Sequence, residues 1–447
     1  MTSLRCLLAL LTLHPAAADS GPRFGLLESI DVAPVVSDFS VGFDLLTSSN
    51  RQYVAYYDAQ RRMTVASRLL VSKQWIYQVL PSKVGWDSHN YITMALDSED
   101  HLHVSGNLHA DPLVYFRTEK AGDILSLKPA VMTGELEDRT TYPRFLNDLD
   151  GRLVFTYREG GSGNGVNLFN RYDTATRTWS RLLDKPLFDG ERLRSAYASL
   201  PSLGPDGLFH IHWVWRDTPD CATNQHLSYA RSRDLIAWET AYGKKLELPI
   251  RYGQSEAIVD PIPAGGGIIN GGHRLAFDSA RKPVLTYHKA DAAGNMQVFI
   301  ARPGPGKWES RTLTDWKTPI HFSGGGSMPF IGITVSISEI APGVLGVGYR
   351  HKDHGSGTIQ LDATTLLPLE RKIPQRPYFP NLLNRIESDF PGMEIRRISR
   401  LDEPGPDGHA YLIQWESLGP NRDKKPPNPL PTPSMLRLHK LKPTSGG

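Results

Sequence analysis

The stretch YPRFLNDLDGRLVFTYREG, residues 142–160, contains the pattern that decides the fold. Two runs in which apolar and polar residues alternate lie on either side of NDLDG, a turn rich in Asp and Gly, and this is typical of a β-hairpin. A similar pattern returns about seven times along the chain, at a spacing of roughly 50 to 75 residues, and very little of the sequence has helical periodicity. An all-β chain with this repeat is typical of a β-propeller.

Further strands lie between the hairpins, and several end in Trp, as in LSYARSRDLIAW, residues 227–238. Two hairpin strands and two further strands make one blade, so we expect a seven-bladed β-propeller with four-stranded antiparallel blades, in a single domain from residue 24 to residue 442. The Pro-rich stretch at about 419–433 is then an extended loop inside the last blade, which strands from both ends of the chain complete. A pair of β-sandwiches is the alternative fold.

The composition excludes several classes of protein. The chain has 447 residues, 22% of them charged, and a formal net charge of +3, which is typical of a globular protein and too mild to favour a nucleic-acid partner. Residues 1–18 combine an early Arg, a short apolar run and small residues, which is the layout of a secretory signal peptide. That run is too short to cross a bilayer and no other stretch is long enough, so we expect a secreted protein without membrane association.

Four of the fifteen histidines lie within residues 86–117. His89 comes just before an apolar run, at the mouth of an expected innermost strand, and His109 follows the next strand. Innermost strands and the loops that enter them converge on the central funnel of a propeller, so we expect these two side chains to face a common cleft. His101 and His103 share one face of the intervening strand and could bind a metal, but without a third ligand nearby a scaffold role is favoured.

The segment FTYREGGSGNGVNLFNRYD, residues 155–173, ends one strand with Tyr157 and Arg158 and begins the next after a Gly-rich loop. No helix follows this loop, so it lacks the helix N-terminus of a phosphate site. We interpret it as a loop kept small so that a polymer can lie across it, with an ordinary flexible hairpin as the alternative.

The segment HIHWVWRDTPDCATNQH, residues 210–226, supplies flat aromatic faces of the kind that stack on sugars, at Trp213 and Trp215. Removal of the signal peptide would remove Cys6 and leave Cys221 as the only cysteine, which we expect to be buried. The alternative is a structural metal held by His212, Cys221 and His226. The full set of expected substrate-binding residues is Asn90, Arg158, Asn164, Trp213, Trp215, Arg216, His273 and Tyr287.

The runs SHNYITMALD, HLHVSGNLHADPLVYFR, YPRF, LVFTYREGGSGNG, NRYD, WVWRDTP and NGGHR resemble the BNR-repeat-like proteins. That group includes the seven-bladed β-propeller polysaccharide lyases, namely the ulvan lyases and the L-rhamnose-α-1,4-D-glucuronate lyases. The resemblance implies a secreted lyase that cleaves the bond to O4 of a glucuronate residue, next to rhamnose, by β-elimination to an unsaturated uronic acid. The expected partner is an acidic polysaccharide of the ulvan or arabinogalactan (gum) type, and the expected state is a monomer.

By motif and spacing, the resemblance implies a catalytic patch made of His89, His109, Tyr157 and Arg171. Arg171 would neutralise the uronate carboxylate and stabilise the enolate-like transition state. His89 would take the C5 proton, Tyr157 would protonate the leaving O4, and His109 would orient the carboxylate. The chemistry requires no cofactor, although the resemblance is compatible with a structural zinc or calcium.

Two other functions are compatible with a propeller. A sialidase-like exo-glycoside hydrolase would share the fold, but its S-x-D-x-G-x-T-W boxes are missing, since the turns here carry D-x-D-G or G-P-D-G without the following T-W. A non-catalytic carbohydrate-binding propeller is favoured if the four polar groups lie apart.

Overall fold

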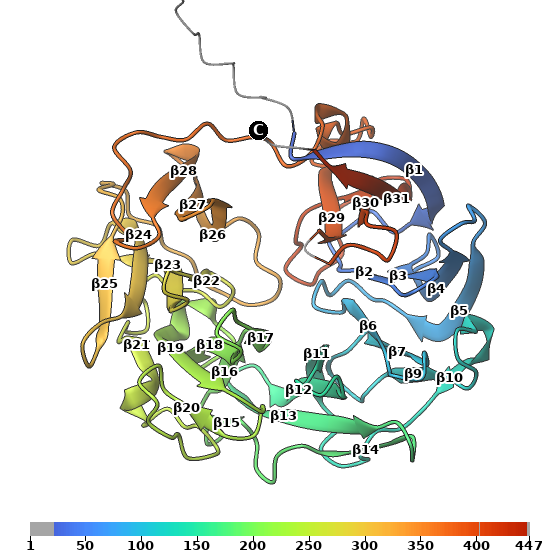
Figure 1. Ribbon diagram of the computed structural model, residues 1–447, viewed down its shortest axis with the longest axis horizontal. Coiled ribbons are helices and arrows are strands. Elements are labelled where there is room, and N and C mark those ends of the chain that lie inside the picture. Colours follow the sequence, from blue (N-terminus) through green and yellow to red (C-terminus); the bar gives the residue numbers. More distant parts are fainter. Residues whose placement is uncertain (1–21, 402, 445–447) are drawn as a thin grey trace, which may run out of the picture.

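The computed structural model describes residues 22–401 and 403–444, so the expected signal peptide at residues 1–18 lies outside the described residues. The described residues form seven antiparallel sheets arranged as a ring around a central axis (Figure 1). Each of the seven hairpins expected from the sequence is present as the inner part of one sheet. The all-β propeller architecture is therefore confirmed.

The first three blades follow the chain in order. Blade 1 consists of β2 (Asp44–Thr47), β3 (Arg51–Tyr57), β4 (Arg62–Leu69) and β5 (Ile76–Lys83). Blade 2 consists of β6 (Ile92–Leu96), β7 (Leu102–Gly106), β9 (Tyr115–Thr118) and β10 (Leu127–Pro129). Blade 3 consists of β11 (Thr140–Asn147), β12 (Leu153–Gly161), β13 (Asn164–Asp173) and β14 (Thr178–Arg181), joined by β8 (His109–Asp111) and β15 (Phe188–Asp189).

The next three blades are less uniform. Blade 4 consists of β16 (Ser195–Ala198), β17 (Ser202–Leu203), β18 (Phe209–Arg216), β19 (Asn224–Ser232), β20 (Trp238–Glu239) and β21 (Ile258–Asp260). Blade 5 consists of β22 (His273–Phe277), β23 (Pro283–Ala290), β24 (Met296–Pro303) and β25 (Trp308–Thr312). Blade 6 has three strands, β26 (Ile333–Ala341), β27 (Val344–His351) and β28 (Gly355–Asp362), so the expectation of four strands in every blade is wrong at this sheet.

The seventh blade closes the ring with both ends of the described chain. β1 (Phe24–Val35) pairs with β31 (Ser434–Pro443), and β30 (Ala410–Ser417) and β29 (Glu394–Arg400) complete the sheet. The register places Phe24 opposite Pro443, so the first and last described strands hold each other. The remaining elements are four short 3-10 turns, η1 (Ile124–Ser126), η2 (Cys221–Thr223), η3 (Ser255–Ala257) and η4 (Asn381–Asn384).

The hydrophobic core lies mainly between neighbouring blades, where the faces of adjacent sheets pack against each other. Trp213 and Trp215 are 0% and 2% exposed and pack in such a layer, with the ring of Phe188 4.6 Å from that of Trp213. They belong to the core between blades 3 and 4, and the suggestion that they stack on sugars is wrong. No helix in the part of the chain that the structure describes is long and apolar enough to cross a membrane.

Candidate functional site

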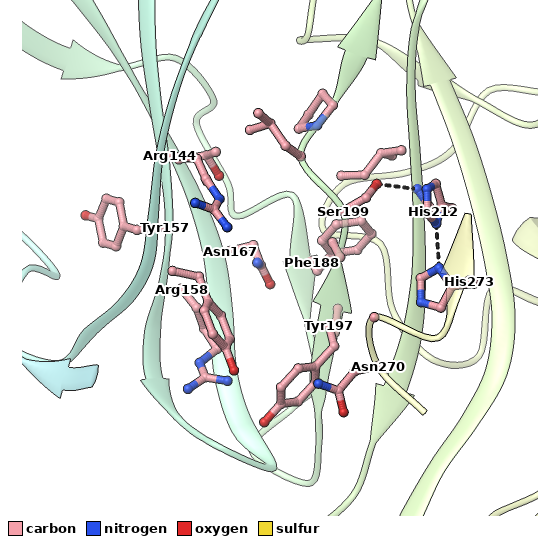
Figure 2. A pocket seen from close by; sticks show the side chains of 18 of the residues that line it. Arg144, Tyr157, Arg158, Asn167, Phe188, Tyr197, Ser199, His212, Asn270 and His273 are labelled. Atoms are coloured by element: carbon pink, nitrogen blue, oxygen red, sulfur yellow. Dashed lines mark hydrogen bonds between the residues drawn. The ribbon is translucent and has the colours of Figure 1, made fainter. Parts of the chain in front are cut away.

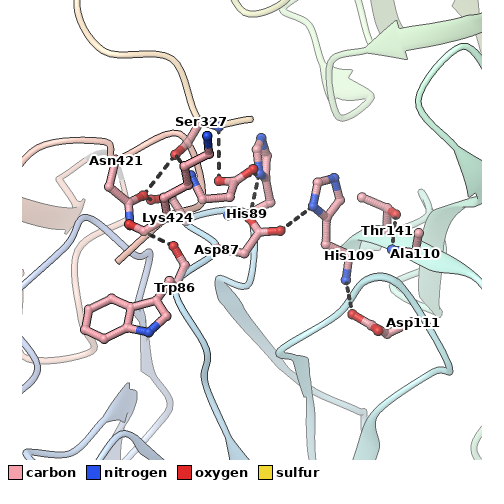
Figure 3. A network of polar contacts seen from close by, with 12 residues as sticks. Trp86, Asp87, His89, His109, Ala110, Asp111, Thr141, Ser327, Asn421 and Lys424 are labelled. Carbon is pink, nitrogen blue, oxygen red and sulfur yellow. Dashed lines mark hydrogen bonds and ion pairs between the residues drawn. The ribbon is translucent and has the colours of Figure 1, made fainter. Parts of the chain in front are cut away.

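Two histidines from neighbouring loops meet over one carboxylate (Figure 3). His89 lies just before β6 and His109 opens β8, and their rings stack with centroids 4.3 Å apart. Nδ1 of His89 lies 2.7 Å from Oδ1 of Asp87, and Nδ1 of His109 lies 2.5 Å from Oδ2 of the same residue. Because Asp87 holds both Nδ1 atoms, Nε2 is the ring atom of each histidine that can meet a substrate.

A second carboxylate approaches His89 from the last blade. Oδ1 of Asp423, in the segment between β30 and β31, lies 3.5 Å from Nδ1 of His89. Burial opposes charge on this imidazole, but the hydrogen bonds and charges of Asp423 and Asp87 outweigh it and raise the pKa of His89 to about 9. Burial also opposes charge on Asp87, yet hydrogen bonds from His109 and His89 hold its pKa far below the usual range. Asp87 and His89 therefore form an ion pair at neutral pH, and His89 is a proton donor.

Tyr142 lies beside the histidine pair, with ring centroids 6.0 Å from His89 and 6.2 Å from His109. A bulge interrupts the pairing of β11 with β12 between Thr141 and Arg144, and Tyr142 has a φ of +59°. A bulky residue in this left-handed region is rare, and such strain concentrates at functional sites. Burial raises the pKa of Tyr142, so its phenol stays neutral.

Arg158, on β12, supplies a buried cation beside the ring of Tyr142, and Figure 2 shows its guanidinium near Tyr197. Its side chain is 1% exposed, and its guanidinium carbon lies 4.9 Å from the ring centroid of Tyr142 and 5.4 Å from that of Tyr197. None of its three guanidinium nitrogens has a hydrogen-bond partner among the described residues. A buried, unpaired guanidinium is costly, and it is the group that a planar carboxylate satisfies best.

Tyr197, on β16, extends the row of rings formed by His109, His89 and Tyr142, which we call the aromatic arc. Its ring centroid lies 6.0 Å from that of Tyr142, and its hydroxyl lies 2.5 Å from Oγ of Ser162. The guanidinium carbon of Arg216 lies 5.2 Å from the Tyr197 ring. Burial raises the pKa of this phenol, but the charges of Arg158 and Arg216 outweigh burial and lower it below its ordinary value. Tyr197 is thus the more acidic of the two phenols.

These groups border one cavity of about 430 Å³, a size common for small-molecule sites. Its lining includes His89, Tyr142, Arg158 and Tyr197, and its far wall is formed by His212, Asn270 and His273 of blades 4 and 5 (Figure 2). The exposed arginines Arg144 and Arg274 also reach it, so its surroundings are strongly basic. A polar, cationic cavity of this kind suits an acidic sugar.

The structure does not bring two of the expected catalytic residues to this arc. Tyr157 is among the residues that line the cavity, but it is buried and its hydroxyl points away from the cavity in Figure 2, 3.0 Å from the carbonyl oxygen of Leu136. Burial raises its pKa to about 12. Arg171 lies farther along β13, opposite Val154, and is not among the described residues that line the cavity. Tyr142 and Arg158 occupy the places that Tyr157 and Arg171 were expected to take.

The expected substrate-binding residues divide into two groups. Arg158 and His273 line the cavity. The guanidinium of Arg216 is not part of the lining but lies beside the ring of Tyr197, which is. Asn90 is buried, and its carbonyl oxygen accepts a hydrogen bond from Tyr57. Asn164 is exposed in the hairpin between β12 and β13.

Tyr287 is buried in the core, and its hydroxyl donates to Asp260 over 2.5 Å. It is therefore unavailable to a ligand in the cavity. The Cys221 side chain is buried, as the sequence predicts.

The three expected metal ligands lie in different surroundings. Nδ1 of His212 lies 2.5 Å from Nδ1 of His273, and burial lowers the pKa of His212 to about 3, which makes this a hydrogen bond between neutral rings. Nε2 of His226 lies 2.9 Å from the Tyr252 hydroxyl. Among the described residues, the one group whose ligand atoms could share an ion is Asp87, His89, His109 and Asp423, with those atoms within 4.8 Å of one another. Hydrogen bonds and ion pairs of the two histidines with Asp87 and Asp423 already account for that arrangement.

Tyr142 and Tyr197 were not predicted as site residues, although their positions in the sequence repeat indicate them. His89, Tyr142, Tyr197 and His273 each lie at or beside the innermost strand of successive blades 2, 3, 4 and 5. The rule that places His89 at the funnel therefore also selects the two tyrosines. The pairing of Asp423 with His89, across 334 positions of sequence, had no such signal.

Two solved structures share the fold over nearly the whole chain. Polysaccharide lyase Uly1 superposes with a TM-score of 0.62 at 15% identity, covering 94% of this chain and 100% of that one. A PL25 ulvan lyase bound to -[GlcA(1-4)Rha3S]- gives a TM-score of 0.56 at 12% identity, covering 88% and 93%.

Curated relatives match over a short segment. The long isoform of ulvan lyase from Pseudoalteromonas sp. (strain PLSV) is 48% identical over 58 residues, which are 12% of this chain and 6% of that protein. The short isoform from Alteromonas sp. (strain LOR) is 41% identical over 59 residues, which are 12% and 11%. The match thus spans a small part of these relatives. The family model described as "BNR repeat-containing family member" matches residues 51–316, more than half of the sequence, and the chain belongs to this BNR repeat-containing family.

Proposed function

We propose that this protein is a polysaccharide lyase that cleaves the bond to O4 of a glucuronate residue by β-elimination, with rhamnose on the other side of that bond. The observation that carries the proposal is Arg158, a buried guanidinium that has no acidic partner among the described residues and lies beside the rings of Tyr142 and Tyr197. The ulvan lyases among the relatives and structural neighbours support the same class of reaction and of substrate.

The carboxylate of the uronate binds Arg158, which offsets its charge and makes the C5 proton easier to remove. Tyr197 carries the phenol whose pKa is lowered by the charges of Arg158 and Arg216, so we assign it as the group that accepts the C5 proton. The electrons form the C4–C5 double bond as the C4–O4 bond breaks. This gives an unsaturated uronate on one fragment and a free hydroxyl on the other.

His89 then donates its proton to the departing O4. This assignment differs from the expectation that His89 is the base, because an imidazole with a pKa of about 9 carries its proton at neutral pH. Tyr142, a neutral phenol between the two groups, hydrogen-bonds to the sugar, and His109 holds Asp87 in line with His89. Groups with pKa values displaced in opposite directions are the usual basis of acid and base assignments.

The test is incubation of the purified protein with ulvan and with rhamnose-capped arabinogalactan, while the ultraviolet absorbance of a conjugated C4–C5 double bond is followed. A lyase gives rising absorbance in step with new chain ends. New reducing ends without absorbance would show a hydrolase, and binding without either product would show a carbohydrate-binding module. Either outcome refutes the proposal.

Secretion is part of the proposal, because the substrate is an extracellular polymer and residues 1–18 have the layout of a leader. Expression of the full sequence in a secreting host, followed by N-terminal sequencing of the protein in the medium, tests it. Protein retained in the cells with residues 1–18 intact would count against export.

A further inference from the structure

The segment between β30 and β31 leaves the last blade and makes contact with the loop that carries His89 (Figure 3). Nδ2 of Asn421 donates to the carbonyl oxygen of Trp86 over 2.8 Å, and Oδ1 of Asn421 accepts from Oγ of Ser88 over 3.3 Å. These bonds lie on both sides of Asp87. The conformation of the His89 loop is therefore coupled to residues more than 300 positions away in the sequence.

A third segment, between β25 and β26, is hydrogen-bonded to residues 422–423. The amide of Ser327 donates to Oδ1 of Asp423 over 3.0 Å, and the amide of Arg422 donates to the Ser327 carbonyl over 3.0 Å. Gly326 has a φ of +73°, and a Cβ there would lie 2.8 Å from the Arg422 carbonyl oxygen. Only glycine fits this approach without displacing the loop.

We propose that Asp423 is a positioning residue that holds His89 in its protonated form and in register with the cavity. The inference rests on the proposed function, because it assigns Asp423 to the acid of that reaction. Asp87 shares one carboxylate between His89 and His109, so it is not a counter-charge for His89 alone. Asp423 brings the second negative charge, and its own oxygen is fixed by the Ser327 amide.

The groups that face His89 come from four elements. Asp87 lies on its own loop, His109 on β8, Tyr142 on β11 and Asp423 on the segment from the last blade. His109 and Tyr142 bring no negative charge at neutral pH. Asp423 is thus the one acidic group among these that does not also bind His109.

The test is Asp423→Asn, which keeps the Ser327 contact and removes only the charge. Loss of one of two carboxylates should lower the pKa of His89 by about one unit. The alkaline limb of the kcat profile should move to lower pH by the same amount. At pH 9, kcat should fall about fivefold, and KM should change less than about twofold.

The pKa is measured directly by NMR titration of histidines labelled at Cε1, with His89→Gln used to assign the signal. This readout needs no turnover, so it tests Asp423 even if the protein proves not to be a lyase. Asp407→Asn is the matched control, since Asp407 forms an ion pair with Lys440 in the same blade, away from the cavity. That variant should leave both the His89 signal and the pH profile unchanged.

Gly326→Ala gives an independent test, because it displaces the Asp423 loop and leaves the charge intact. It should shift the His89 titration in the same direction as Asp423→Asn. An unchanged His89 pKa in Asp423→Asn overturns the inference. A loss of activity that is equal at every pH would also overturn it, since this would show a purely structural role.

Discussion

Arg158→Met should make the protein more stable and inactive at the same time. Arg158 is 1% exposed and has no hydrogen-bond partner among the described residues, so the folded protein bears the cost of a desolvated cation. Met fills a similar volume, keeps the apolar contacts of the Arg stem and carries no charge. The substitution therefore removes a cost of folding and leaves the packing.

The size of the effect follows from two opposing contributions. The effective cost of burying an ion is several kcal/mol, and replacing buried charges with apolar residues often stabilises a protein by about 1 to 4 kcal/mol. The faces of Tyr142 and Tyr197 lie within 5.4 Å of the guanidinium and offset part of this cost, by about 0.5 to 2 kcal/mol each. We therefore expect a net gain of about 1 to 2 kcal/mol in the free energy of unfolding.

Calorimetry and turnover together provide the assay. The usual unfolding entropy per residue, applied to a chain of this length, gives about 0.9 kcal/mol per kelvin, so Tm should rise by about 1 to 2 °C. The loss of one preorganised group that stabilises the transition state should lower kcat/KM by a factor of about 100 to 1000. Denaturant unfolding gives the free energy independently of Tm.

Arg181→Met is the matched control in the same blade. Nη1 of Arg181 donates to Oη of Tyr157 over 2.8 Å and to Oδ1 of Asn170 over 2.6 Å, so this arginine has partners where Arg158 has none. Its loss leaves buried acceptors unsatisfied and should destabilise the protein by about 2 to 4 kcal/mol, with little effect on kcat in the folded fraction. If Arg158→Met were destabilised like Arg181→Met, or kept its activity, the assignment of Arg158 as a vacant carboxylate site would be refuted.

Three further predictions concern the pair of acid and base groups and the core. His89 has its pKa raised from 6.5 to about 9, so its ion pairs stabilise the fold fully below about pH 6.5 and this contribution is lost as pH rises through 9. Denaturant unfolding at a series of pH values should show the free energy of unfolding falling by up to roughly 3 kcal/mol over that interval. The fall should be much smaller in His89→Gln. A free energy of unfolding that rises over the interval would contradict the ion pairs. Tyr142→Phe should reduce kcat by about 10- to 100-fold with an unchanged Tm, since only a hydroxyl is removed, and full activity would exclude a contact with the sugar. Trp213→Ala should cost about 3 to 5 kcal/mol because the ring is fully buried, and a near-neutral effect would mean that the residue is not in the core.

The fold could be predicted from the sequence because hairpins are local. Alternation along residues 142–160 sets which side chains face a neighbouring blade, and the turn between them fixes the pairing. A strand that pairs with the sheet of a neighbouring blade could not be predicted from local patterns. β8 lies between β7 and β9 of blade 2 in the chain but pairs with β11 of blade 3, through contacts that no local pattern encodes.

The candidate site could be predicted only in part, because local patterns locate strand ends but not irregularities within a strand. His89 and His109 lie at strand mouths, and the structure brings them together over Asp87. Tyr157 was selected from a position on the second strand of its hairpin, where alternation turns it into the core between blades. Tyr142 reaches the cavity because a bulge and a positive φ break the alternation of β11, and counting along the strand does not reveal such a break.

The distribution of charge around the cavity determines how an acidic sugar lies in it. The imidazole of His89 at one end already faces Asp87 and Asp423, so its positive charge is compensated within the protein. At the other end Arg158 has no acidic partner among the residues described, and Arg216 adds a second guanidinium within 5.2 Å of Tyr197. In the proposed mechanism the carboxylate binds at the arginine end, with O4 towards His89 and C5 towards Tyr197. The reverse orientation would place the carboxylate against Asp87 and Asp423 and leave Arg158 buried without a partner, so electrostatics alone distinguishes the acid from the base.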